Sequence, residues 1–84
     1  MISKIQGTRK GTERGSAIEV TLGEFHRIKR EQGGMTQGFQ VELNGKLFDV
    51  TGRGKDFKRA GNTFIYFYIT PALVVADPYR ITVE

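Results

Sequence analysis

The clearest pattern of alternating apolar and polar positions lies in residues 38–52. The alternation has the period of two that is typical of a half-buried strand, and it occurs on both sides of an Asn44-Gly45 pair. That pair favours a two-residue type I′ turn, because both of its residues must adopt positive φ. Pairing across the turn places Phe39 opposite Val50, so the apolar side chains of both strands share one face. The pattern therefore predicts a β-hairpin.

A second alternating segment, residues 62–70, is dense in aromatic and β-branched side chains, which favour strands. Pro71 is expected to end this strand, because proline cannot donate to the next ladder hydrogen bond. Alternation separates two faces of the strand: Ile65, Phe67 and Ile69 on one, and Phe64, Tyr66 and Tyr68 on the other.

The sequence around residues 21–34 favours a short helix over residues 23–32. Thr21 and Glu24 have the spacing of a capping box, and the Gly33-Gly34 pair is a typical helix stop. The competing interpretation continues the preceding strand through a kink at Gly23.

Weaker patterns complete the prediction of secondary structure. Short strands are expected at residues 2–6, 17–22 and 79–83, a turn at Asp77-Pro78, and either a strand or one helical turn at residues 72–76. Together these elements predict a single mainly β domain (small α+β) over residues 1–84. Its expected form is a compact five- or six-stranded antiparallel barrel or curved sheet, OB-like or SH3-like, with at most one helix. A flexible basic loop is expected at residues 7–16 and a basic loop at residues 53–61.

The distribution of charged residues bears on the class of partner that the domain binds. The chain has 84 residues and a net charge of +4, with a pI near 9.7. Residues 4–14 hold four basic and one acidic side chain, residues 26–31 hold three and one, and residues 53–59 hold four and one. If folding brings these three segments to one side of the domain, they form a surface suited to a polyanion. If folding scatters them, their charges only add solubility.

The inventory of reactive side chains argues against catalysis and metal binding. The sequence has no cysteine, and its single histidine, His26, is expected to be structural or exposed. The glycine-rich segment at residues 52–55 lacks the spacing of a phosphate-binding loop. We therefore expect a non-enzymatic protein with no metal, cofactor or small-molecule substrate. No apolar run reaches the roughly 18 residues that span a bilayer, and no signal pattern occurs at the start, so no membrane partner and a cytoplasmic location are expected.

The leading functional hypothesis is binding of single-stranded DNA or RNA, which proteins bind with basic grooves and stacking rings. The predicted phosphate contacts are Arg53, Lys55, Lys58 and Arg59, with Lys10, Arg14, Arg27, Lys29 and Arg30 further out. The predicted stacking residues are Phe64, Tyr66 and Tyr68.

Three other interpretations remain open on sequence alone. The aromatic face could lie at the rim of the core. Alternatively, the chain could be a subunit of an oligomeric assembly of the kind that viruses and mobile elements encode, with Tyr66, Tyr68 and Tyr79 as interface anchors. A third possibility is an inhibitor that occupies the anionic site of an enzyme.

Overall fold

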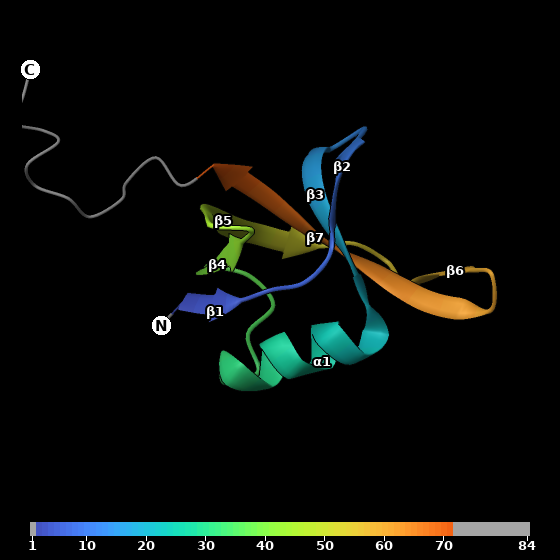
Figure 1. Cartoon of the computed structure of the whole chain (residues 1–84), viewed down its shortest axis with the longest axis horizontal. Coiled ribbons are helices and arrows are strands. Elements are labelled where there is room, and N and C mark those ends of the chain that lie inside the picture. The colour runs from blue at the N-terminus through green and yellow to red at the C-terminus, as the bar shows by residue number, and fades with distance from the viewer. Residues whose placement is uncertain (1, 72–84) are drawn as a thin grey trace, which may run out of the picture.

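The computed structural model describes residues 2–71, which form one strongly curved sheet and one helix (Figure 1). The protein is mainly β, as predicted. In chain order its elements are β1 (Ile2–Lys4), β2 (Thr8–Thr12), β3 (Gly15–Thr21), α1 (Leu22–Glu31), β4 (Phe39–Leu43), β5 (Lys46–Arg53), β6 (Phe57–Arg59) and β7 (Asn62–Pro71). The expected elements at residues 72–76, 77–78 and 79–83 lie outside the described residues.

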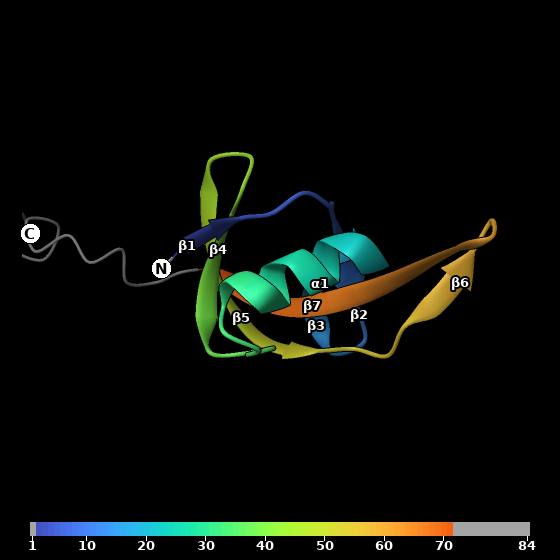
Figure 2. The same ribbon diagram turned by 90° about the horizontal axis from the view of Figure 1, so that it is seen from below.

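The order of strands in the sheet is β1-β4-β5-β7-β3-β2, and β6 pairs with β7 as an extension of the β5 side. Strands β1 and β2 lie at opposite ends of this order, although only residues 5–7 separate them in the chain. The sheet must therefore curl until its two edges approach each other, which Figure 2 shows from below. One expectation was wrong: the sheet is not purely antiparallel, because β1 pairs with β4 in parallel. Helix α1 lies between these two strands in the chain and provides the long connection that parallel pairing requires.

The predicted hairpin at residues 38–52 is confirmed in its register. Phe39 pairs with Val50 in the β4–β5 ladder, and the turn residues Asn44 and Gly45 have φ values of 51° and 82°. The turn chemistry and the apolar alternation thus specify the same pairing, which is why this element could be predicted without tertiary information.

The predicted helix is also confirmed, and the alternative of a strand kinked at Gly23 was wrong. The Glu24 N–H donates a hydrogen bond of 3.1 Å to the Thr21 hydroxyl, as an N-cap requires. Gly33 and Gly34 follow the helix with positive φ values of 69° and 92°, so they end it in a conformation that glycine adopts without strain.

The hydrophobic core lies between α1 and the concave side of the sheet (Figure 2). The Phe25 ring of α1 lies 5.2 Å from the Phe67 ring of β7, measured between ring centres, and Ile28 is fully buried beside them. The predicted inner face of β7 is confirmed, because Ile65, Phe67 and Ile69 are all buried. Burying these side chains is the main contribution to the stability of a domain this small.

Both segments predicted as basic loops contain strands, which raises the strand count within residues 2–71 to seven instead of five or six. Residues 7–16 contain β2, an exposed edge strand that pairs with β3. Residues 53–61 continue β5 through a Gly54 N–H hydrogen bond of 2.8 Å to the Tyr66 carbonyl, and then form β6. Ala60 and Gly61, both at positive φ, make the turn into β7. An edge strand is held by backbone hydrogen bonds and needs no apolar side chains, so hydrophobic alternation does not reveal it.

Gly7 marks the closest approach between the start of β2 and β3, and it supports a testable prediction. A Cβ atom at Gly7 would lie 2.4 Å from the Glu19 carbonyl oxygen and 2.7 Å from Cγ2 of Ile18. We expect Gly7→Ala to lower the free energy of unfolding by about 1–3 kcal/mol, because the backbone must shift to relieve this overlap. Urea denaturation measures the change. The matched control is Gly11→Ala, where the added Cβ has no atom within 4 Å; equal stabilities of the two variants would contradict the prediction.

Candidate functional site

A row of aromatic side chains lies on the outer face of β7, opposite the core. Phe64, Tyr66 and Tyr68 alternate with the buried residues of the strand, and each is partly exposed. Phe57 of β6 pairs with Phe64 and joins them. The ring centres are 5.9 Å apart for Phe57 and Phe64, 5.0 Å for Phe57 and Tyr66, and 6.4 Å for Tyr66 and Tyr68. We call these four residues the aromatic row.

The aromatic row faces away from the helix. Helix α1 packs against the opposite side of β7 through Phe25 and Phe67, so it covers the core face and leaves the row uncovered. Sequence reasoning missed Phe57, because it treated residues 53–61 as a loop. Once β6 is known to pair with β7, cross-strand register places Phe57 on the aromatic face.

An open groove of about 600 Å³ adjoins the aromatic row. Its lining residues are Arg14, Arg53, Gly54, Lys55, Tyr66 and Tyr68. The backbone at Gly54 passes directly against the rings, since a Cβ there would lie 3.2 Å from the Tyr68 hydroxyl oxygen and 3.3 Å from Cβ of Tyr66. The groove therefore combines aromatic rings, a strip of backbone and cations.

An arginine lies over each end of the aromatic row. The guanidinium carbon of Arg14 is 4.5 Å from the centre of the Tyr68 ring, and that of Arg59 is 4.6 Å from the centre of the Phe64 ring. Such stacking attracts the guanidinium to the negative face of the ring and restricts its motion. The row is thus bounded by two oriented arginines, with Tyr66 between them.

Glu19 binds two cations on this face, Arg59 of β6 and Lys10 of β2. It pairs with Tyr66 across the β3–β7 ladder and is only 5% exposed. Arg59 donates two hydrogen bonds to its carboxylate, and the Lys10 Nζ lies 3.9 Å from it. The hydrogen bonds from Arg59 outweigh the effect of burial, so the pKa of Glu19 lies below its usual value of 4.5. Glu19, Arg59 and Lys10 together carry a charge of only +1.

The structure brings some predicted phosphate contacts to the aromatic row and places others elsewhere. Arg14, Lys55, Lys10 and Arg59 lie beside the row or its groove. Arg53 lines the groove, but its guanidinium carbon is 5.1 Å from the Phe25 ring centre, on the helix side. The remaining predicted contacts lie away from the row. Lys58 pairs with Thr63, so its side chain points to the side of the sheet opposite Phe57. Arg27, Lys29 and Arg30 lie on α1.

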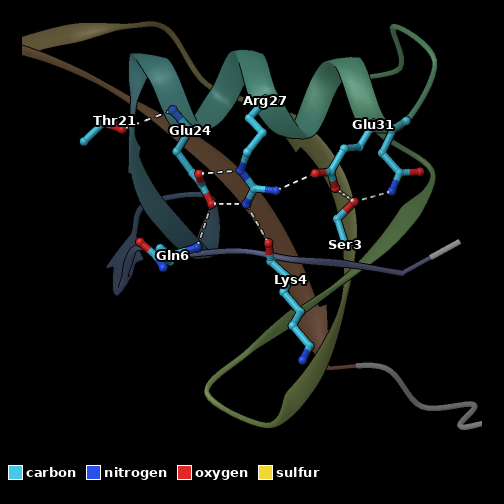
Figure 3. Close-up of polar contacts among 8 residues, drawn as sticks. Ser3, Lys4, Gln6, Thr21, Glu24, Arg27 and Glu31 are labelled. Carbon is cyan, nitrogen blue, oxygen red and sulfur yellow. Dashed lines mark hydrogen bonds and ion pairs between the residues drawn. The ribbon is translucent and has the colours of Figure 1, made fainter.

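Arg27 is engaged in holding the helix to the first strand (Figure 3). Its guanidinium donates hydrogen bonds to the Glu24 carboxylate at 2.6 and 2.9 Å, to Glu31 at 2.6 Å and to the Lys4 carbonyl at 2.7 Å. The hydrogen bonds to Glu24 are the chief reason that the pKa of Arg27 is raised. These contacts give Arg27 a structural role.

Ser3 extends this network into the interior. The buried Ser3 hydroxyl donates to the Glu31 carboxylate at 2.7 Å and accepts from the Gln32 amide at 2.8 Å. The Gln6 N–H donates to the Glu24 carboxylate at 2.8 Å, so side chains of α1 bind the β1 segment at both ends (Figure 3). The Ser3 hydroxyl and then Arg27 lower the pKa of Glu31. Partial burial opposes ionisation of Glu24, but hydrogen bonds from Arg27 and Gln6 prevail and lower its pKa as well.

Other chemistry is sparse in the described part of the chain. His26 is exposed on α1, with its ring 5.6 Å from the Phe25 ring. Residues 2–71 contain no group of three acidic, histidine or cysteine side chains placed to hold a metal ion. Within the same residues, the helix is too short and too polar to cross a membrane.

The lowered carboxylate pKa values predict how stability depends on pH. Because Glu19, Glu24 and Glu31 titrate at lower pH in the folded protein, their contribution is complete above the unfolded pKa near 4.5 and is lost as the pH falls through the folded values. We expect the urea midpoint to decline below about pH 4.5. The decline should be smaller in Arg27→Gln, which lacks the partner of two of these carboxylates. Lys29→Gln is the control, and an acid loss in Arg27→Gln as large as in that control would contradict the assignment.

Comparisons of the chain with protein-family models, with curated proteins and with solved structures found no match. Its function must therefore be inferred from the geometry of the aromatic row, the groove and the cations beside them.

Proposed function

We propose that this protein is a non-enzymatic, cytoplasmic single-stranded nucleic-acid-binding protein. The observation that carries the proposal is the aromatic row on the outer face of β6 and β7, bounded by Arg14 and Arg59 and open to a groove of about 600 Å³. Stacking rings beside oriented cations are the two elements with which proteins bind single strands.

The aromatic row would supply base contacts. Each base has a π face, and stacking a base on an aromatic side chain stabilises the complex by about 1–3 kcal/mol. Tyr66 lies in the middle of the row, lines the groove and is partly exposed. Tyr68 lines the same groove, so two successive bases could enter it beside Arg14.

The form of the row favours a single strand over a duplex. The rings are partly buried in the outer face of the sheet, where they can stack on the flat face of a base. Duplex bases present their edges in the grooves and hide their faces by stacking, whereas single-stranded bases can be splayed onto protein rings. Arg14 and Lys55, at the rim of the groove, are placed to contact the phosphates between such bases.

A protein interface is the second candidate, because the same row is apolar and contains two tyrosines, which are frequent at the centres of interfaces. Light scattering over a range of concentrations separates the two functions. A discrete oligomer that does not bind oligonucleotides would favour the assembly role, and a monomer that binds them would favour the nucleic-acid role.

The decisive experiment titrates labelled single-stranded and duplex oligonucleotides with the protein at two or more salt concentrations. For the single strand we expect log affinity to fall with log salt, with a slope of about 0.7 for each phosphate contact. The duplex should bind more weakly at every salt concentration. Absence of single-strand binding at low salt would refute the proposal.

Tyr66→Ala tests the stacking role of the row. We expect single-strand affinity to fall by about 1–3 kcal/mol while the fold persists, because the side chain is only partly buried. Tyr66→Phe should retain most of the affinity, since the ring remains. His26→Ala removes an exposed ring from α1 and serves as the control. If Tyr66→Ala unfolds the domain in a thermal melt, the row belongs to the core instead.

Arg14→Gln and Lys55→Gln test the phosphate contacts. Each variant should reduce the slope of log affinity against log salt by about 0.7, because each removes one contact. Arg30→Gln makes the same change of net charge on α1, away from the row, and should leave the slope unchanged. Equal slopes for all three variants would show that charge acts only at long range.

A further inference from the structure

Glu19 is the one buried ionisable residue in the described part of the chain, and it lies within the proposed binding face. We propose that Glu19 withholds Arg59 and Lys10 from phosphates and so confines the phosphate path to the Arg14 and Lys55 end of the aromatic row. This inference rests on the proposed function, and it assigns the residue that sets where the strand's phosphates lie.

The exposures of the three side chains support this role. Arg59 is 52% exposed and Lys10 is 41% exposed, whereas the carboxylate between them is 5% exposed. Solvent and phosphates can therefore reach the cations, whereas Glu19, on the interior strand β3 and on the same face as Tyr66, lies buried against them. A phosphate that took Arg59 for itself would leave a buried carboxylate without its main partner, which is strongly unfavourable.

The two ends of the proposed binding face therefore differ in the charge that they offer to phosphates. At the β6 end, Glu19 pairs with Arg59, whose guanidinium lies over the Phe64 ring, so this end offers little free charge. At the other end, Arg14 stacks on Tyr68 and Lys55 lines the groove, with no carboxylate among the groove residues. Phosphates are thus favoured at the second end, beside the bases that would enter the groove at Tyr66 and Tyr68.

The test is a comparison of salt dependence among charge-matched variants, using a labelled oligothymidine of about 12 nucleotides. In Glu19→Gln, Arg59 and Lys10 are released, so the slope of log affinity against log salt should steepen by about 0.7–1.4. Affinity at low salt should rise about tenfold, as expected for one regained charged contact. Adding Arg59→Gln to Glu19→Gln restores the wild-type net charge and should reduce the slope again by about 0.7.

Glu42→Gln is the matched control, because it removes a carboxylate from β4, which is separated from β7 by β5. It makes the same change of net charge and should leave the slope unchanged. If Glu19→Gln behaves like Glu42→Gln, while the wild-type protein binds the oligonucleotide, the role of Glu19 is refuted and the proposed function stands. If the wild-type protein does not bind, the proposed function itself fails.

A thermal melt establishes first that Glu19→Gln folds. If it does not, Arg59→Gln in the otherwise unchanged chain gives the answer. An unchanged slope would support the proposal, because Arg59 then contacts no phosphate in the native protein. A slope lower by about 0.7 would overturn it.

Discussion

The pairing of β7 along both of its edges is the constraint on which the rest of the structure depends. One edge bonds β5 and β6, and the other bonds β3, so the strand cannot rotate about its axis. Alternation along β7 then places Ile65, Phe67 and Ile69 in the core under α1. Phe64, Tyr66 and Tyr68 lie on the outer face. Core and candidate site are thus the two faces of one strand, and a one-residue slip of its register would exchange them.

Hydrophobic alternation and local turn chemistry sufficed to predict the elements that carry their own signals. The β4–β5 hairpin, α1 and both faces of β7 could be predicted because each depends on residues close in the chain. Strands β2 and β6 could not, since β2 has no apolar residue and β6 has only Phe57, so both resemble charged loops. The parallel pairing of β1 with β4 was also missed, because it depends on where the curled sheet brings the N-terminal segment.

The candidate site was predictable in part for the same reason. The rings of β7 follow from alternation, but the fate of each cation depends on partners far away in the sequence. Arg59 meets Glu19 across 40 positions, and Arg27 meets the Lys4 carbonyl across 23. A count of charges in the sequence treats both arginines as free. In the folded protein, Arg27 binds the helix to β1, and Arg59 is paired with the buried Glu19. Net charge therefore overstates the number of cations that a polyanion could contact.

The parallel pairing of β1 also has a consequence for the order of assembly. Ile2 and Gln40, which pair in this ladder, are 38 positions apart in the chain, and the network around Arg27 needs the finished helix. Strand β1 is an edge strand of three residues that pairs only with β4, so we expect it to join the sheet after the interior strands β3, β5 and β7 and to detach before them. Detachment of the N-terminal segment would break its hydrogen bonds to the side chains of α1 and leave the β3–β7–β5 ladder intact.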